Sequence, residues 1–251
     1  TSQGQTTQRG GTLVHLLPYV EQKPLYDMLD FRGILIVDNS VFPGTTNLIR
    51  YNNPVGVFVC PSDTAGDMFQ ETVGGSQVGV QNYVSSQGSS TVGHTNTGNT
   101  GGMPPCVSPY SGLALGGAVE IYGVSGCFRR GLPTGCTIAE ITDGTSNVIW
   151  FGEVRPECSQ HVARGWLHSN NGQGMGSTTI PINFDSCSTD NTTGCRWWHT
   201  WNTEFGFRSR HPGGAQFAFG DGVVRFLSEN VDTTAYQRMG GKADGNPVQL
   251  P

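Results

Sequence analysis

The segment AQFAFGDGVVRFL, residues 215–227, predicts its own structure most clearly. On both sides of Gly220-Asp221-Gly222, apolar residues alternate with other residues in the period-2 pattern of half-buried strands. An Asp-Gly step between two such runs is a strong hairpin signal, because a tight turn needs residues that tolerate positive φ. We therefore predict a hairpin whose strands cover residues 215–220 and 223–228.

Four more strands are predicted upstream of the hairpin, each from a short apolar run beside turn-forming residues. They cover residues 55–60, 119–130, 136–139 and 147–152. The first run is stopped by Pro61-Ser62-Asp63, and Asp143-Gly144 opens a turn before the last. These runs are the candidate partners of the hairpin in one sheet.

Helical segments are expected near both ends of the chain. Residues 12–30 carry apolar side chains at the i, i+3, i+4 and i+7 spacing of one helix face, namely Leu13, Leu16, Leu17 and Val20. Pro18 and Pro24 interrupt this stretch, so two short helices are expected rather than one. Near the C-terminus, Asp232 should cap a short helix that Gly240 ends.

The composition is that of an extracellular, loop-rich β protein. Of 251 residues only 13% are charged, whereas 37 are glycine, and Ser, Thr and Asn are plentiful. The length suits a single domain over residues 1–251, with polar loop insertions at about 85–117 and 157–204. A net charge of -5 argues against nucleic acid as a partner, because phosphate binding needs a basic surface. No apolar run approaches the roughly 20 residues of a membrane span.

The cysteine pattern favours disulfides in an oxidising compartment, with buried reduced thiols as the alternative. No C-x-x-C occurs among the seven cysteines, so zinc-ribbon and thioredoxin-type motifs have no support. Cys127 and Cys136 flank a Gly-Leu-Pro-Thr-Gly turn and should bond across strands, and Cys187 should bond Cys195 across an Asn/Thr/Gly loop. One further bond is expected among the remaining cysteines, Cys60, Cys106 and Cys158. The odd cysteine stays free or pairs between chains.

Two sets of side chains are candidate ligands for a metal ion. His211 either binds a metal or a glycan or is structural, with its ring bonded to backbone carbonyls near the hairpin; a lone His without a second ligand at metal spacing favours the structural role. Asp143, Thr145 and Asn147, together with Asp221, offer the oxygens that calcium prefers. The alternative for this second set is a turn with its cap.

Trp197, Trp198 and Trp201 form the densest aromatic cluster of the chain. Adjacent tryptophans in a polar loop either stack on sugar rings or a neighbouring subunit, or cover the core beneath the loop. Both interpretations stay open at this stage.

Five segments, in order along the chain, match the motifs of one family. The last is a His followed after nine residues by Asp-Gly, which here runs from His211-Pro212-Gly213-Gly214 to Asp221-Gly222. The others are LLPYVEQ…PLY (residues 16–26), VFVCPSD (57–63), NYV (82–84) and ITDGTSN…GE (141–153). Together they resemble a large family known mainly from Planctomycetes. Its members carry a prepilin-type N-terminal signal, a long hydrophobic helix and an exported domain.

The resemblance implies an α+β, pilin- or pseudopilin-like globular domain, in which helical segments cover one face of a mostly antiparallel β-sheet. It implies export, and therefore an extracellular or cell-surface location. The prepilin signal and the hydrophobic helix are absent from this chain, and we expect them upstream of residue 1. Major pseudopilins of type II secretion bind calcium in a C-terminal loop, which agrees with calcium as the candidate cofactor.

The leading functional expectation is a structural subunit of an extracellular type IV pilus-like or pseudopilus filament, with copies of itself as partners. The region 197–201 is expected to be one buried anchor between subunits. The alternative is a cell-surface or periplasmic protein that binds a solute or a glycan in a deep pocket with convergent polar groups. An enzyme is not expected, because no H-E-x-x-H, phosphate-binding loop or G-x-S-x-G elbow occurs.

Overall fold

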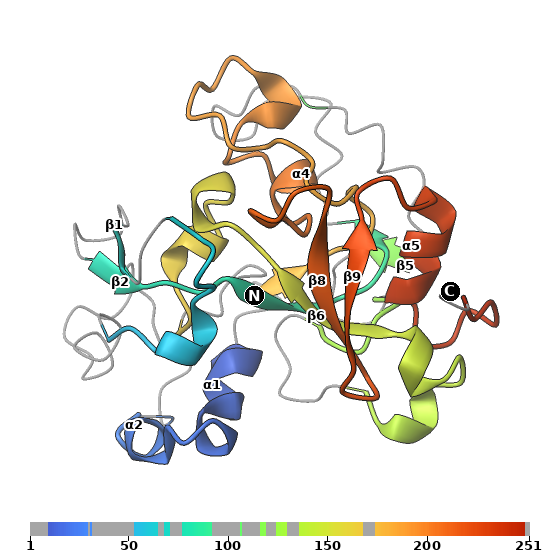
Figure 1. Ribbon diagram of the computed structural model, residues 1–251, viewed down its shortest axis with the longest axis horizontal. Coiled ribbons are helices and arrows are strands. Elements are labelled where there is room, and N and C mark those ends of the chain that lie inside the picture. The colour runs from blue at the N-terminus through green and yellow to red at the C-terminus, as the bar shows by residue number, and fades with distance from the viewer. Residues whose placement is uncertain are drawn as a thin grey trace, which may run out of the picture.

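A five-stranded mixed sheet lies at the centre of the molecule, with the strand order β7-β3-β6-β8-β9 (Figure 1). The computed structural model describes residues 10–29, 31, 53–64, 68–70, 77–91, 106, 116–118, 124–129, 136–167 and 174–248. The strands of the sheet are β3 (Tyr83–Ser86), β6 (Ile149–Glu153), β7 (Met175–Gly176), β8 (Gly214–Phe219) and β9 (Val224–Ser228). Neighbours are antiparallel except β3 and β7, which are parallel. The fold is therefore α+β with a mostly antiparallel sheet.

The β8–β9 hairpin forms where the Asp-Gly step predicts it. The two strands keep one antiparallel register from Gly214 to Ala218 of β8. Gly222 has a φ of 84°, a conformation that other residues rarely adopt, and the Asp221 carboxylate accepts a hydrogen bond from the Val223 N–H at 2.9 Å. The chemistry of the turn thus fixes how the strands pair.

The two faces of the sheet have different covers. On one face, Val84 and Phe217 pack in a buried cluster with Tyr236 and Met239 of α5 (Thr233–Gly240). The predicted helix is confirmed, since the carboxylate of its N-cap residue Asp232 accepts from a backbone N–H inside the first turn at 2.8 Å. This face is the main core of the protein.

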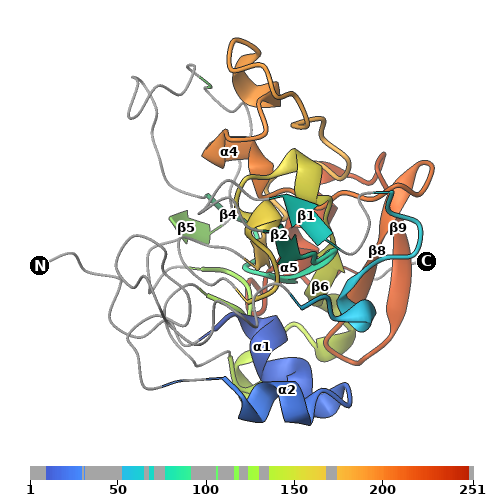
Figure 2. The same cartoon turned by 90° about the vertical axis from the view of Figure 1, so that its left-hand side faces the viewer.

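The N-terminal helices cover part of the opposite face. α1 (Thr12–Leu16) is followed by a 3₁₀ turn, Leu17–Tyr19, and then by α2 (Lys23–Asp27), so the prediction of two short helices is confirmed. The Thr12 hydroxyl donates to the Ser85 hydroxyl of β3 at 3.1 Å, and Phe151 of β6 packs against the apolar cluster of these helices. Both helices lie together at the lower end of the molecule in Figures 1 and 2.

The predicted strand at residues 55–60 is wrong. The segment forms a 3₁₀ turn, Gly56–Phe58, whose Phe58 N–H donates to the Val55 carbonyl at 2.8 Å. Val55 and Phe58 are buried, while Val57 between them is 54% exposed. Apolar residues three apart face the core from a 3₁₀ turn, whereas a strand would have alternated them.

The predicted strand at residues 136–139 is also wrong, and so is the described part of the one at 119–130. Residues 124–129 form a bend, and residues 119–123 and 130 lie outside the described residues. Thr137 caps a 3₁₀ turn, Ile138–Glu140, in a capping box with Glu140. The T-x-x-E pattern that signals this box is present in the sequence. The strands predicted at 147–152, 215–220 and 223–228 are confirmed.

The residues predicted as polar insertions contain buried segments. Within 85–117, the segment 85–90 is buried at the end of β3. Within 157–204, Trp166 and Leu167 are 1% and 0% exposed and join the cluster of the N-terminal helices. The buried carboxylate of Glu204 accepts from the Ser159 hydroxyl at 3.0 Å and contacts a ring nitrogen of His161 at 2.8 Å. The segment 157–204 therefore contributes buried residues to the core although it contains few helices and strands.

Three disulfides tie the chain together, and the sequence predicted one of them. Cys127–Cys136 is confirmed. The predicted Cys187–Cys195 bond is wrong: Cys187 pairs with Cys158, and Cys195 with Cys106. The expected bond among Cys60, Cys106 and Cys158 is therefore wrong too, and Cys60 is free. Short sequence spacing predicts a pair only where a local turn brings the two cysteines together.

The remaining elements are short. β1 (Met68–Gln70) pairs antiparallel with β2 (Gln77–Gly79), and β4 (Ser90–Thr91) pairs parallel with β5 (Gly116–Ala118). Single 3₁₀ turns cover Thr145–Asn147, Pro156–Cys158, Val162–Arg164 and Gly194–Arg196, and α4 covers Trp201–Glu204. Within the described ranges, no helix has the length and apolar character that crossing a membrane requires.

Candidate functional site

Segments that lie far apart in the sequence converge where β3 pairs with β6. Tyr83, the first residue of β3, lies opposite Glu153, the last residue of β6. The loop that carries Cys60 and the loop that carries His211 both reach this pair, as the contacts below show. The convergence creates a cluster of four side chains, Cys60, Tyr83, Glu153 and His211, which we call the CYEH cluster.

Asn82 holds the Cys60 loop against the sheet. Its side-chain oxygen accepts from the Cys60 N–H at 3.0 Å, and its side-chain nitrogen donates to the Val154 carbonyl at 3.2 Å and to the Asp63 carboxylate. Its own backbone N–H donates to the Phe58 carbonyl at 2.8 Å. Asn82 is 1% exposed, so these bonds are made away from water and rigidly position Cys60.

The His-Pro-Gly-Gly turn places His211. The Ser209 hydroxyl accepts from the His211 N–H at 3.0 Å and donates to the Gly214 carbonyl at 2.6 Å. Gly213 has a φ of 79°, and a Cβ on Gly214 would lie 2.0 Å from the Leu227 carbonyl oxygen. The first glycine is needed for the turn and the second for close contact with β9.

The Cys60, Glu153 and His211 side chains meet tip to tip. One carboxylate oxygen of Glu153, Oε1, lies 3.3 Å from His211 Nε2 and 3.9 Å from Cys60 Sγ. The other, Oε2, accepts from the Gln216 N–H of β8 at 2.7 Å. The Glu153 side chain is 5% exposed and that of His211 33%, so the group is buried on the Glu153 side and open on the His211 side.

Tyr83 completes the cluster as a protonated phenol. Burial raises its pKa to about 12, and the adjoining Cys60 thiol and Glu153 carboxylate act in the same direction. The Tyr83 hydroxyl therefore keeps its proton at physiological pH and is available as a hydrogen-bond donor to its neighbours.

An ion-pair chain ties the two loops together beside the cluster. Arg210, next to His211, lies 3.7 Å from the Asp63 carboxylate of the Cys60 loop and also pairs with Glu157. Glu157 in turn contacts Arg155 at 2.6 Å. Charged groups thus hold the two loops at a fixed distance from each other.

Comparison with known families identifies the chain. Residues 1–234 match the model of the family SBP_bac_10, which is described as "Protein of unknown function (DUF1559)". The chain belongs to the DUF1559 family. No curated protein and no solved structure matches it. The matched range contains every residue of the CYEH cluster.

The structure gives His211 of this DUF1559 protein a side-chain partner. Its ring nitrogen faces the Glu153 carboxylate, and not the backbone carbonyls that a purely structural histidine was expected to meet. The other motif residues have backbone roles, since Gly213 and Gly214 shape the turn while Asp221 and Gly222 form the hairpin loop.

The oxygen-bearing side chains proposed for calcium bind other groups. The two carboxylate oxygens of Asp143 accept from the N–H groups of Asp244 and Gly245 at 2.7 and 3.0 Å. Asn147 donates to the Asp143 carbonyl at 2.7 Å from the turn that Thr145 begins. Asp221 also faces Arg225 at 3.4 Å. Calcium binding by Asp143, Thr145, Asn147 and Asp221 stays a prediction.

The tryptophan cluster is only partly described. Trp197 and Trp198 are half-buried, and the Trp197 ring centre lies 4.8 Å from that of His199. Trp201 begins α4, and its side chain lies outside the described residues. The role of this cluster as a subunit anchor stays a prediction.

Three residues of the CYEH cluster were not predicted as site residues, namely Cys60, Tyr83 and Glu153. Each lies in a segment that matches a family motif, VFVCPSD, NYV or GE. The available signal was that each of these motifs contains at least one titratable side chain, as the His-Pro-Gly-Gly motif does. Spacing could not reveal the cluster, because Cys60 and Glu153 are 93 residues apart.

Proposed function

We propose that this DUF1559 protein is the exported globular part of a structural, non-catalytic subunit, which assembles with copies of itself into an extracellular pilus-like or pseudopilus filament. The observation that carries the proposal is the apolar outer side of β9. This strand is the last in the order of the central sheet and has β8 as its neighbour on one side. Val224 is 62% exposed and Phe226 46%.

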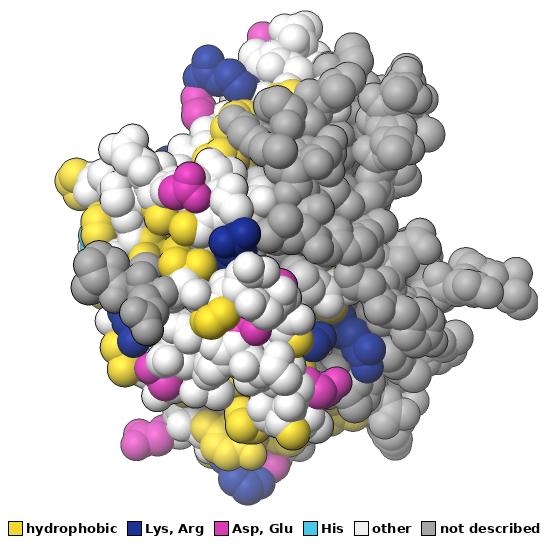
Figure 3. Space-filling view, turned by 90° about the vertical axis from the view of Figure 1, so that its right-hand side faces the viewer, with side chains coloured by type: hydrophobic (Ala, Val, Ile, Leu, Met, Phe, Trp, Pro, Cys, Tyr) yellow, Lys and Arg dark blue, Asp and Glu magenta, His cyan; other side chains and the backbone are white. Residues whose placement is uncertain are grey.

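The two sides of β9 differ in their surroundings. Leu227 points into the core cluster with Phe217, and the Arg225 guanidinium lies 4.5 Å from the Phe219 ring centre. Because side chains alternate along a strand, Val224 and Phe226 project from the other face. Figure 3, a view from the right-hand side of Figure 1, shows exposed hydrophobic side chains in several separate patches among charged and polar ones. An apolar strand at the end of a sheet is a natural contact for another chain.

The physical character of the chain suits repeated self-contact. A patch that meets a different patch on the next copy gives an open, repeating assembly. Only 13% of the residues are charged, so identical subunits repel one another weakly. Three disulfides fit an exported protein.

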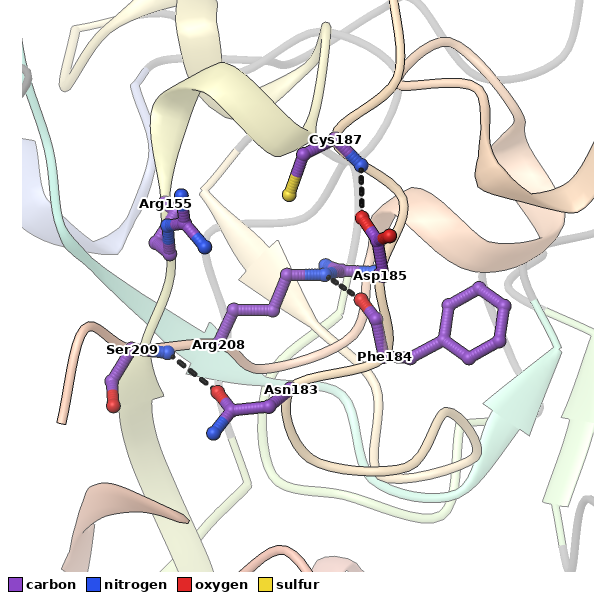
Figure 4. A pocket seen from close by; sticks show the side chains of 7 residues that line it. All are labelled: Arg155, Asn183, Phe184, Asp185, Cys187, Arg208 and Ser209. Atoms are coloured by element: carbon purple, nitrogen blue, oxygen red, sulfur yellow. Dashed lines mark hydrogen bonds between the residues drawn. The ribbon is translucent and has the colours of Figure 1, made fainter. Parts of the chain in front are cut away.

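The alternative, a solute- or glycan-binding protein, has weaker support from the cavity shown in Figure 4. The cavity has a volume of about 120 Å³, against the roughly 300–1,000 Å³ typical of small-molecule sites. Its most prominent cation, Arg208, is 2% exposed and donates to the backbone carbonyls of Thr203, Phe184, Glu204 and Gly206. These bonds leave Arg208 little capacity for a ligand, which favours a structural role.

Self-association of the full exported protein tests the proposal. Replacing Val224 and Phe226 together with Ser removes two side chains that would each contribute roughly 1.5–3 kcal/mol if fully buried in a contact. Since 1.4 kcal/mol corresponds to tenfold in affinity, we expect association at least about 10-fold weaker. Analytical ultracentrifugation and electron microscopy of the secreted material measure this loss.

Two further variants complete the experiment. Tyr19→Ser is the matched control, because Tyr19 is 83% exposed and lies in the N-terminal 3₁₀ turn, away from β9 in the sequence. Replacing Trp197 and Trp198 with Ser tests the predicted second anchor. Assembly of the β9 variant at the yield of Tyr19→Ser would refute the β9 contact. A native protein found only as a monomer with a bound solute would favour the binding-protein alternative.

A further inference from the structure

We propose that Cys60, Glu153 and His211 form a binding site for a divalent transition-metal ion of the zinc type. The site does not depend on the filament proposal. Among the described residues, these side chains are the one group of three or more His, Cys, Asp or Glu residues that could hold a metal ion. Their ligand atoms all lie within 4.8 Å of one another.

Two of the three spacings between the ligand atoms are close to those of a tetrahedral zinc centre, and the third, between Cys60 Sγ and His211 Nε2, is within 4.8 Å. With Zn–N and Zn–O bonds near 2.0–2.2 Å and Zn–S near 2.3 Å, ligand atoms lie roughly 3.3–3.6 Å apart. Glu153 Oε1 lies 3.3 Å from His211 Nε2 and 3.9 Å from Cys60 Sγ. Small side-chain rotations of Cys60 and His211, which are both only half-buried, would bring all three within bonding distance of one ion.

The charges of the site also fit such an ion. One thiolate and one carboxylate neutralise a divalent cation, while the imidazole binds without charge. A neutral centre removes the cost of the nearly buried Glu153 carboxylate, which otherwise faces only His211 as a basic group among the described residues. A thiolate and an imidazole select a borderline ion such as zinc over calcium or magnesium, which prefer oxygen ligands.

Surrounding groups hold the ligands in place, as is usual around metal sites. The Gln216 N–H fixes the second carboxylate oxygen of Glu153 at 2.7 Å, and Asn82 fixes the backbone of Cys60 at 3.0 Å. His211 is 33% exposed, so the ion can enter from the solvent side. Three protein ligands leave the fourth position of a tetrahedral ion for water or an external donor.

The test uses the full chain, purified with its disulfides intact and freed of bound metal with a chelator, and Co²⁺ as a spectroscopic probe. A chromogenic thiol reagent first counts accessible thiols, and one per chain is expected, from Cys60. Added Co²⁺ should then give the intense thiolate-to-cobalt charge-transfer band and the ligand-field bands of a tetrahedral ion, and one equivalent of Zn²⁺ should abolish both. Zinc should also raise the melting midpoint of the native protein by mass action.

Variants assign the ligands. Cys60→Ser should lose the charge-transfer band. Replacing a group that only supports a ligand typically weakens metal binding about 10- to 100-fold, and Glu153→Gln and His211→Gln should each weaken it by at least that much. His199→Gln, a histidine outside the cluster, should bind like the native chain. Glu153→Gln keeps an acceptor for the Gln216 N–H, and unchanged disulfides and circular dichroism show that each variant is folded.

Several results would overturn the proposal. They are a native chain without a free thiol, a free thiol without a charge-transfer band on adding Co²⁺, a band that survives Cys60→Ser, and native affinity in both folded Glu153→Gln and His211→Gln. In the last case the Glu153–His211 contact is only a hydrogen bond.

Discussion

Removing the disulfides one at a time should destabilise the protein in the order of the loops that they close. The Cys106–Cys195 bond spans 89 residues and the Cys127–Cys136 bond spans 9. We would replace each pair with two alanines. Double variants are needed because a single replacement leaves a new thiol, which as a thiolate can attack one of the remaining disulfides and exchange partners with it.

The loop lengths set the expected magnitudes. A cross-link restricts the unfolded chain more when it closes a longer loop. At 25 °C the chain-entropy relation gives about 2.6 kcal/mol for the short loop and about 4 kcal/mol for the long one, which the other two disulfides shorten because both lie inside it. The two variants are well matched otherwise, since each pair joins one buried and one half-buried cysteine. The difference of about 1.5 kcal/mol therefore reports loop length and not the number of contacts removed. The third pair, Cys158–Cys187, spans 29 residues and should fall between them, at about 3.6 kcal/mol.

Urea denaturation measures the free energy of unfolding of the native chain and of each variant under non-reducing conditions. Equal losses, or a larger loss from the short loop than from the long one, would refute the reasoning from loop entropy. Peptide mapping of the unreduced native protein tests the pairing itself. A Cys187–Cys195 linkage in the map would contradict the structure and restore the pairing expected from sequence spacing.

Two further predictions concern the turn that places His211 and the Tyr83 hydroxyl of the CYEH cluster. Gly214→Ala should lower the free energy of unfolding by about 1–3 kcal/mol, because its Cβ would lie 2.0 Å from the Leu227 carbonyl oxygen, whereas Gly56→Ala, with no atom within 4 Å, should leave the thermal melting midpoint nearly unchanged. The raised pKa of Tyr83, about 12, favours the protonated phenol in the folded state, so its contribution to stability is complete below the ordinary pKa of 10.0 and is lost as the pH rises through 12. Tyr83→Phe should remove this part of the alkaline stability loss in denaturation curves between pH 9 and 12, and an unaltered pH profile would contradict it.

Local chemistry made much of the fold predictable. The β8–β9 hairpin follows from the Asp-Gly step, and α5 follows from the Asp232 cap. Pro18 divides the N-terminal helical stretch, and the Cys127–Cys136 bond joins cysteines only 9 residues apart. In each case the residues that determine the structure lie within about ten positions of one another. Turn and capping preferences act at that range without help from the rest of the chain.

Longer-range features came only from the folded chain. The run at residues 55–60 has the composition of a strand, but it packs Val55 and Phe58 on the core, and Asn82 bonds the Phe58 carbonyl and the Cys60 N–H, so it becomes a 3₁₀ turn. The wrong Cys187–Cys195 pairing has the same origin, since Cys195 finds its partner 89 residues away.

The CYEH cluster shows the same division most clearly. The hairpin and the His-Pro-Gly-Gly turn are local, so the sequence could place His211 beside the end of β9 but could not name its neighbour. Glu153 becomes that neighbour through the pairing of β6 with β8, and Cys60 through the hydrogen bonds of Asn82. Strand pairing and burial act between residues that are distant in sequence, and many pairings share the same local patterns, so only the packed chain selects the one that brings thiol, carboxylate and imidazole together.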